Sequence, residues 1–277
     1  MKLKILLHLL LVSTVVLSCK KDAVIQPDTL VPEYTLPQGN HDYDARIVNF
    51  QHKYGCYILY KFTDKDFQWN ITNLIPYVAD QGDENYITPA LNALDTYLFH
   101  YYSDGFLKLA LPYKIILSAR IRKVDPSSND TLETPLSSAS SFSHFAFGHA
   151  SSRLATLSAD ELKQMKADLH TEFWRQAVGT GKVGISPIFA KSTDYSVVNQ
   201  YNVKYYGVLG EQEGDYTVYS DLAGYIQLIT STTADQLEQT LFLPKNDPNG
   251  KYRLKYNAIV NYYKTIYGVD LQAIGAN

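Results

Sequence analysis

The spacing of hydrophobic positions predicts strands mainly in the first half of this chain and helices mainly in the second. Apolar residues in short runs or at every second position favour strands, whereas apolar residues three or four apart favour helices. The expected strands are Gly55–Phe62, Phe106–Leu111, Tyr113–Ile121 and one within Phe145–Leu157. The expected helices are Asp42–His52, Ala90–Tyr102, Ser158–Val178, Leu222–Thr230, Thr233–Phe242 and a last one after Gly250. Strands followed by helices indicate an α+β fold rather than an alternating parallel one.

The clearest helix signal begins at Ser158. Ser158 and Glu161 have the spacing of a capping box, in which each side chain bonds to the backbone N–H of the other residue. Apolar positions then recur at spacings of three and four: Leu162, Met165, Leu169 and Phe173. Gly179 and Gly181 end the pattern, so we expect the helix to stop near Val178.

Other stretches give different signals. Residues 125–143 are rich in Ser, Asp, Asn, Thr and Pro, which favours a loop, and residues 180–218 show no regular period. Ser220 or Asp221 can cap the helix that follows. The last helix carries an aromatic and apolar stripe at positions Tyr252, Tyr256, Ile259, Tyr263 and Tyr267. We interpret this stripe as a core-facing surface.

The first 18 residues have the pattern of a secretion signal that precedes an acylated cysteine. Lys2 and Lys4 come before the apolar run Ile5–Leu17, which is shorter than the roughly 20 residues that span a bilayer. The run leads to Leu-Ser-Cys19, the pattern at which bacterial lipoproteins are cleaved and acylated. We expect residues 1–18 to be a lipoprotein signal peptide and Cys19 to be the lipid attachment site. A plain signal peptide with a chance cysteine is the alternative.

The residues after Cys19 suggest a tether and then one domain. Pro27, Pro32 and Pro37 interrupt residues 19–40, which we interpret as a flexible tether. Residues 41–277 are long enough for one substantial domain or two small ones, and we expect a single domain. Without residues 1–18 the only cysteine besides Cys19 is Cys56, so a disulfide within the domain is not expected.

Composition narrows the possible partners. Once Lys2 and Lys4 are removed, 23 basic and 28 acidic residues remain and the formal charge is −5. Nucleic acids favour basic faces, so we expect no nucleic-acid partner. The chain has 23 tyrosines, which suit surface-boundary packing; a platform for stacking sugar rings is the alternative interpretation.

The segment Asp168–Ala177 reads DLHTEFWRQA. It resembles the central helix of the zinc metallopeptidases described as substrate import-associated zinc metallohydrolase lipoproteins, which accompany SusC/SusD-like outer-membrane importers. That family carries His-Glu-Phe-x-His in a similar apolar frame. The two His hold zinc, the Glu is the general base for metal-bound water, and a Glu on a later helix completes the ligand set.

The resemblance covers most of the mature chain loosely, through segments that occur in the same order: Tyr60–Asp64, Gly105–Leu117, Tyr219–Gly224 and Asn261–Leu271. It implies a zincin-like domain with an N-terminal mixed strand and helix half and a helical C-terminal half. It also implies an address at the outer membrane, lipid-anchored and on the cell surface. The partners it implies are an outer-membrane barrel or importer complex with its lipoproteins, and a peptide or glycan.

The chain departs from the family at the metal ligands. Placed on the motif, Thr171 and Arg175 take the two His positions and Gly224 takes the later Glu, while Glu172 and Phe173 are kept. A fixed cation at Arg175 repels a divalent metal. We therefore expect no metal, no cofactor and no catalytic residue, with Thr171, Glu172, Arg175 and Gly224 as vestigial positions. A salt bridge is the expected role of Glu172.

Nearby residues offer a poor replacement for the missing ligands. His170 points about 100° away from Thr171 on a helix, and about 200° away from Glu172. Asp221 with Glu172 and water would form only a weak, oxygen-rich site. His144 and His149 are five residues apart, a spacing that suits neither one helix face nor one strand face.

Three functions follow from this sequence. The first is a catalytically inactive zincin-like lipoprotein that acts as a binding or scaffold subunit of an outer-membrane complex. The second is an active zinc metallopeptidase with an atypical metal site. The third is a surface lipoprotein that binds glycans through exposed Tyr and Trp, with Trp69 the candidate for exposure and Trp174 expected in the core. Two Asp-Thr-Leu triplets, 28–30 and 130–132, are candidate O-glycosylation sites.

Overall fold

The computed structural model describes residues 33–68, 77–125, 131–210 and 215–276. The expectations about residues 1–18, Cys19, the triplet at 28–30, Trp69 and Asp130 lie outside these residues. Leu36–Asn277 forms one compact unit, so the last residues of the expected tether, 36–40, belong to this unit. The Gln38 side chain accepts the backbone N–H of Tyr60 at 2.9 Å and donates to the carbonyl of Lys61 at 2.6 Å.

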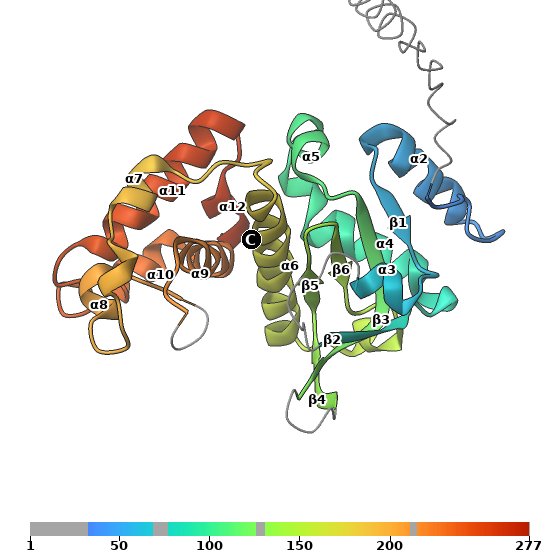
Figure 1. The fold of residues 1–277 in the computed structure, drawn as a ribbon, viewed down its shortest axis with the longest axis horizontal. Coiled ribbons are helices and arrows are strands. Elements are labelled where there is room, and N and C mark those ends of the chain that lie inside the picture. Colours follow the sequence, from blue (N-terminus) through green and yellow to red (C-terminus); the bar gives the residue numbers. More distant parts are fainter. Residues whose placement is uncertain (1–32, 69–76, 126–130, 211–214, 277) are drawn as a thin grey trace, which may run out of the picture. The chain divides into compact units, whose positions relative to one another are not determined.

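A mixed sheet forms the first half of the unit (Figure 1). Its strands are β1 (Tyr57–Leu59), β2 (Tyr77–Gln81), β3 (Lys114–Val124), β4 (Thr131–Leu136), β5 (Ser138–Ser140) and β6 (His144–Phe147). The order is β1-β3-β6-β5, in which β1 and β6 run parallel to β3 and β5 runs antiparallel to β6. β2 and β4 pair antiparallel with the distal part of β3. β5 is therefore an edge strand of this path.

Helices cover the sheet and form the second half. Those of the sheet half are α2 (Asp44–Tyr54), α3 (Asp64–Gln68), α4 (Ile87–Tyr97), α5 (Asp104–Ala110) and α6 (Ala159–Gly179). Those of the helical half are α7 (Pro187–Lys191), α8 (Val203–Tyr206), α9 (Val218–Ser231), α10 (Ala234–Gln239), α11 (Lys251–Tyr267) and α12 (Leu271–Gly275). α6 contacts β5 and β6 on one side and α9 on the other, so it joins the two halves (Figure 1).

The apolar spacing explains most of these elements. The capping box at Ser158 and Glu161 is formed as expected, and α6 ends one residue beyond Val178. On α11, Tyr252, Ile259 and Tyr263 are buried, as predicted from the stripe. The predicted α+β class is confirmed, with the strands in the N-terminal half and helices in the C-terminal half. Within the described residues, no helix is both long and apolar enough to cross a bilayer.

Three predictions of secondary structure are wrong. Residues 180–218, expected to be irregular, contain the short helices α7 and α8. Phe106–Leu111, expected as a strand, is helix α5, because the Ser103 hydroxyl accepts the N–H of Phe106 at 3.2 Å and starts a helical turn. Phe106, Leu107 and Ala110 are buried on one side of this helix. Residues 125–143, expected as a loop, contain β4 and β5. Pairing with β3 and β6 imposes these strands on a sequence of low strand propensity.

Three helix starts also differ. The helix expected at Asp42–His52 is α2, which runs from Asp44 to Tyr54. The helix expected from Ala90 begins at Ile87 and ends at Tyr97, with a 3-10 turn at Phe99–Tyr101. α9 begins at Val218, and its cap is Thr217 rather than Ser220 or Asp221. Thr217 accepts the N–H of Ser220, so the start signal lies one turn before the expected one.

Candidate functional site

The motif helix α6 carries the positions that the sequence singled out. Phe173 and Trp174 are buried in the core, which fixes the rotation of the helix. Thr171 is also buried, and its hydroxyl donates to the carbonyl of Ala167 at 2.8 Å. This bond stays inside the helix, so Thr171 offers its hydroxyl to its own backbone rather than to a ligand.

The partners of Glu172 include one residue on α6 and one on the sheet. The Ser140 hydroxyl on β5 donates to one carboxylate oxygen at 2.5 Å, and the Arg175 Nε donates to the other at 3.2 Å. The expected salt bridge of Glu172 is present. Glu172 therefore ties the edge strand β5 to α6, and both of its oxygens already accept hydrogen bonds. Nothing in the sequence pointed to Ser140, because its strand was not predicted.

Gly224 does not face the motif helix. A Cβ atom built on Gly224 would lie 1.9 Å from the carbonyl oxygen of Leu209, which leaves no room for a side chain. Four α9 residues share a small cavity with Arg175 and Trp174, namely Tyr219, Leu222, Ala223 and Ile226, and Gly224 is not among them. Arg175 and Ala223 are thus brought together, whereas Gly224 is not. Successive helix residues point about 100° apart, so the alignment placed the later Glu one residue away from the cavity.

These residues do not fit a zinc ion. Neutral imidazole, thiolate and carboxylate are the ligands that zinc takes in proteins. At this site Thr171 is bonded to backbone, Arg175 is a cation and Gly224 has no side chain. Across the described residues, no group of three or more His, Cys, Asp or Glu side chains could hold a metal ion.

The buried histidines are committed elsewhere. His170 is buried, and its Nδ1 lies 2.6 Å from the Tyr102 hydroxyl, which also accepts the Trp174 indole N–H at 2.8 Å. Burial lowers the pKa of His170 to about 3, with the Lys166 and His100 charges adding to the effect. The imidazole is neutral at neutral pH and belongs to an aromatic core cluster.

His144 and His149 on and after β6 behave in the same way. Burial lowers the pKa of His144 to about 3 and that of His149 to about 4. The Ser141 hydroxyl lies 2.7 Å from His144 Nδ1, and the Ser137 hydroxyl lies 3.3 Å from His149 Nε2. We therefore interpret both as neutral core residues.

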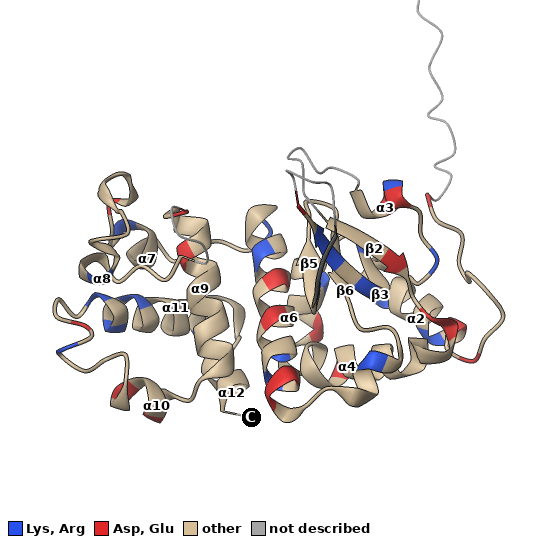
Figure 2. Ribbon diagram, turned by 90° about the horizontal axis from the view of Figure 1, so that it is seen from below, with Lys and Arg blue, Asp and Glu red and all other residues tan. Residues whose placement is uncertain are grey.

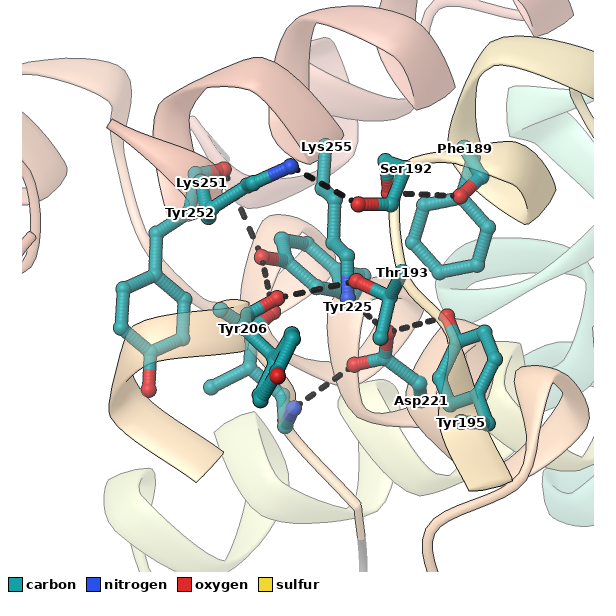
Figure 3. A network of polar contacts seen from close by, with 12 residues as sticks. Phe189, Ser192, Thr193, Tyr195, Tyr206, Asp221, Tyr225, Lys251, Tyr252 and Lys255 are labelled. Carbon is teal, nitrogen blue, oxygen red and sulfur yellow. Dashed lines mark hydrogen bonds and ion pairs between the residues drawn. The ribbon is translucent and has the colours of Figure 1, made fainter. Parts of the chain in front are cut away.

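Asp221 sits in a buried polar network of the helical half (Figure 3). Lys255 on α11 donates to its Oδ2 at 2.6 Å, and the Tyr195 hydroxyl donates to the same oxygen at 2.7 Å. The backbone N–H of Leu209 donates to Oδ1 at 2.7 Å. The side chains of Asp221 and Lys255 are both fully buried. The oxygens of Asp221 are therefore already engaged by a cation, a hydroxyl and a backbone amide, which disfavours the weak oxygen-rich site with Glu172 that the sequence suggested.

Burial and pairing act against each other in this ion pair. Burial raises the pKa of the Asp221 carboxyl, and the Lys255 ammonium opposes that rise. Burial lowers the pKa of Lys255, and Asp221 opposes that fall. The sequence did contain a signal for the pair: Lys255 lies within the buried stripe of the last helix, three residues after Tyr252 and four before Ile259.

The aromatic residues bear on a glycan site. Trp174 is buried, with its ring 4.4 Å from that of Tyr263 between centroids, so it cannot stack on a sugar. Trp69 lies outside the described residues.

Comparison with known proteins gives one structural likeness. No family model and no curated protein matches the sequence. The structure is similar to a crystal structure described as a "putative zinc-binding metallo-peptidase" from Bacteroides caccae, with a TM-score of 0.49 and 13% identity over 83% of this chain and 87% of that one. Likeness at this level leaves the activity and ligands of this chain to be argued from its own residues.

Proposed function

We propose that this protein is a lipid-anchored outer-membrane lipoprotein whose zincin-like domain binds a partner and does not hydrolyse a substrate. The observation that carries the proposal is the hydrogen bonding of Glu172. One carboxylate oxygen accepts a bond from Ser140 and the other accepts a bond from Arg175, so the glutamate kept from the metallopeptidase motif holds β5 and α6 together.

The chemistry of a metallopeptidase needs more than a glutamate. Its general base acts on water that a metal has made acidic. The Arg175 guanidinium beside Glu172 repels a divalent cation, since two positive charges are brought close in a partly desolvated place. Thr171 and Gly224 supply no ligand. A structural ion pair is what these residues can make.

The proposed address follows from the sequence before residue 33. Acylation of Cys19 would hold the domain at a membrane, because each buried methylene contributes about 0.8 kcal/mol and several chains on one cysteine anchor stably. A binding subunit held in this way would meet the components of an outer-membrane barrel or importer complex. We therefore propose a scaffold or binding role in such a complex, without a cofactor.

Metal analysis of the purified mature protein tests the loss of catalysis. We expect far less than one zinc per chain, and no cleavage of peptide mixtures that a chelator abolishes. Glu172→Gln should leave the metal content unchanged, as should the control Glu238→Gln in an exposed ion pair with Arg253. Near-stoichiometric zinc that Glu172→Gln removes would overturn the proposal.

Membrane fractionation tests the address. The full-length chain should partition with the outer membrane and be released only by detergent, whereas Cys19→Ala should be recovered in the soluble fraction. The intact mass of the detergent-extracted protein should equal that of a chain that begins at Cys19 and carries acyl chains. An unmodified mass, or a Cys19→Ala protein that stays in the membrane, would contradict the anchor.

A further inference from the structure

A groove lies between α7 and α11. Neither helix carries any of the motif positions discussed above. The volume of the groove is about 590 Å³, within the range of sites that hold ligands or peptide side chains. α7 contributes Pro187 and Ile188. α11 contributes an apolar row at four-residue intervals: Leu254, Ala258, Tyr262 and Ile266.

The rim of this groove is unusually apolar for a surface. Ile188 is 66% exposed, Ile266 58% and Leu254 41%. A single exposed aliphatic residue is ordinary, but several around one hollow mark a binding surface. Covering them would remove hydrocarbon from water, at about 25 cal/mol for each Å².

A polar row beside the apolar one narrows the choice of occupant. Asn257, Asn261 and Thr265 also line the groove, again four residues apart. Hydrocarbon offers these side chains no hydrogen bond, and each polar group left unpaired on burial costs about 1–3 kcal/mol. A polypeptide can satisfy them through its backbone or side chains. The row therefore favours a polypeptide over a lipid surface.

The charges of α7 and α11 narrow the choice of occupant further. α7 and α11 together carry five cations and no Asp or Glu, as Figure 2 shows for α11. Arg253, Lys255 and Lys264 are paired with acidic residues of other elements. In the described part of the chain, Lys191 and Lys251 pair with no carboxylate. A second copy would bring equal positive charges face to face, whereas acidic residues would complement them.

The walls of the groove are held in place from within. Lys255 of α11 lies 5.5 Å from the Phe189 ring centre of α7, and that ring packs edge-on against Tyr225 of α9. Lys251 donates to the carbonyl of Ser192, just after α7. A groove that is fixed before binding loses little conformational entropy when it is filled.

We propose that the groove between α7 and α11 binds a segment of a partner polypeptide that combines large aliphatic residues with neighbouring Asp or Glu. The inference rests on the proposed binding role and places its docking surface. The aliphatic side chains enter the hollow beside Leu254 and Ile266. The acidic ones extend past its lining toward Lys251, three residues before Leu254, and Lys191, three residues after Ile188.

Site-specific photo-crosslinking in cells that make the full chain finds the segment. A benzophenone amino acid replaces Ile266 in one variant and Leu109 in a control, which is an exposed aliphatic residue on α5. We expect a discrete protein adduct at position 266 and not at 109. Mass spectrometry should map it to a segment with Leu, Ile or Val beside Asp or Glu. Adducts only to lipid or to another copy of this chain, or no adduct, overturn the proposal.

A synthetic peptide of the mapped segment then tests the chemistry. Fluorescence anisotropy should show at least tenfold weaker binding for Ile266→Asp and for Ile188→Asp, and several-fold weaker binding for Lys251→Glu or for a peptide with Lys in place of its acidic residues. Leu109→Asp should bind as the parent does, and circular dichroism checks that every variant is folded. Equal affinity for the parent and the Ile266→Asp variant overturns the proposal. The affinity for the peptide should be the same with and without a chelator in the buffer. Peptide binding in the groove can therefore be judged separately from whether the protein holds a metal.

Discussion

The buried histidines of the sheet half and the buried ion pair of the helical half are two different ways of burying polar groups, although the sheet half also buries Asp44 and Lys114. The sheet half buries neutral imidazoles, His144, His149 and His170, each with a hydroxyl close to a ring nitrogen. The helical half buries a full ion pair, Asp221 with Lys255, and surrounds it with hydrogen bonds. The difference makes the first half sensitive to protonation and the second sensitive to the loss of a partner.

The boundary between the halves holds a third arrangement. Glu172 and Arg175 on α6 form an ion pair whose side chains are 21% and 35% exposed. A pair in contact with water contributes little, because solvent screens it. The polar groups at the motif positions are therefore the weakest of the three sets, and the following predictions test this ranking.

Acid should destabilise the protein through the sheet half. The unfolded chain binds protons on its histidines below about pH 6.5, whereas the folded chain resists until about pH 3 or 4. Proton uptake therefore favours unfolding in this window, by about 1.4 kcal/mol per pH unit for each histidine. We expect a loss of up to roughly 5 kcal/mol between about pH 7 and pH 5, measured by urea unfolding at each pH.

His170→Asn should reduce the steepness of this pH dependence by about one third, whatever it does to stability at neutral pH. The matched control is His52→Asn, which removes an exposed histidine of α2 and should leave the steepness nearly unchanged. A free energy of unfolding that stays flat between about pH 7 and pH 5 would refute the neutral-imidazole interpretation.

Removing one partner of the buried ion pair should be nearly as costly. Asp221→Ala leaves the Lys255 ammonium buried without a counter-charge, and we expect a loss of about 4 kcal/mol in the free energy of unfolding. The double variant Asp221→Leu with Lys255→Met should recover most of it, because no charge then remains buried. Glu238→Ala breaks an exposed pair with Arg253 and should cost less than about 1 kcal/mol. Equal losses of unfolding free energy for Asp221→Ala and Glu238→Ala would show that the buried pair is no more important for stability than the exposed one.

A methyl group at Gly224 should destabilise the helical half by about 1–3 kcal/mol. The added Cβ would lie 1.9 Å from the Leu209 carbonyl oxygen, so backbone must move. Gly179→Ala is the matched control, because it also lies in a helix and a Cβ there meets nothing within 4 Å. The control should be neutral or slightly stabilising, since alanine favours a helix over glycine by about 1 kcal/mol.

The same geometry can be tested with zinc. Thr171→His and Arg175→His place two imidazoles four residues apart on α6, and a third ligand is then added on α9. Glutamate introduced at Ala223 should give tighter zinc binding than glutamate at Gly224, because Ala223 lines the cavity with Arg175. Zinc affinities are measured by competition with a zinc indicator. Equal affinities for the two variants would contradict the conclusion that Ala223, and not Gly224, is directed toward this cavity.

The smallest effect is expected at the boundary. Glu172→Gln keeps the hydrogen bond from Ser140 and removes a screened ion pair with Arg175, so stability should fall by less than about 1 kcal/mol. Glu172→Ala also loses the bond to β5 and should cost somewhat more. Unfolding by urea measures both, and a loss above about 3 kcal/mol for Glu172→Gln would place this pair with the buried ones.

Local signals in the sequence predicted what local interactions determine. The capping box of Ser158 and Glu161 predicted the start of α6, and the spacing of three and four residues between Leu162, Met165, Leu169 and Phe173 predicted its buried face, on which Met165, Leu169 and Phe173 are buried. The α+β class followed from the order of such segments. The residues near Phe106 misled because their apolar pattern fits a strand, while the cap at Ser103 makes them a helix.

Contacts between distant segments were out of reach of the sequence. β5 forms because Ser138 and Ser140 pair with β6, and this pairing is what brings Ser140 to Glu172. The rotation of α9 that turns Ala223, and not Gly224, toward α6 depends on how Leu209 packs behind it. Lys255 in an otherwise apolar stripe was a readable sign of a buried partner, although its identity as Asp221 required the fold.

If the residues after Cys19 form the expected tether, the docking of Gln38 against the end of β1 limits the length of that tether. Since the compact unit begins at Leu36, at most 17 residue steps separate it from Cys19, a contour of about 60 Å when fully extended. If Cys19 is acylated as proposed, the domain stays within about this distance of the bilayer surface. A partner anchored nearby in the same bilayer meets it at an effective concentration of the order of millimolar, so even a weak grip in the groove would keep the two together.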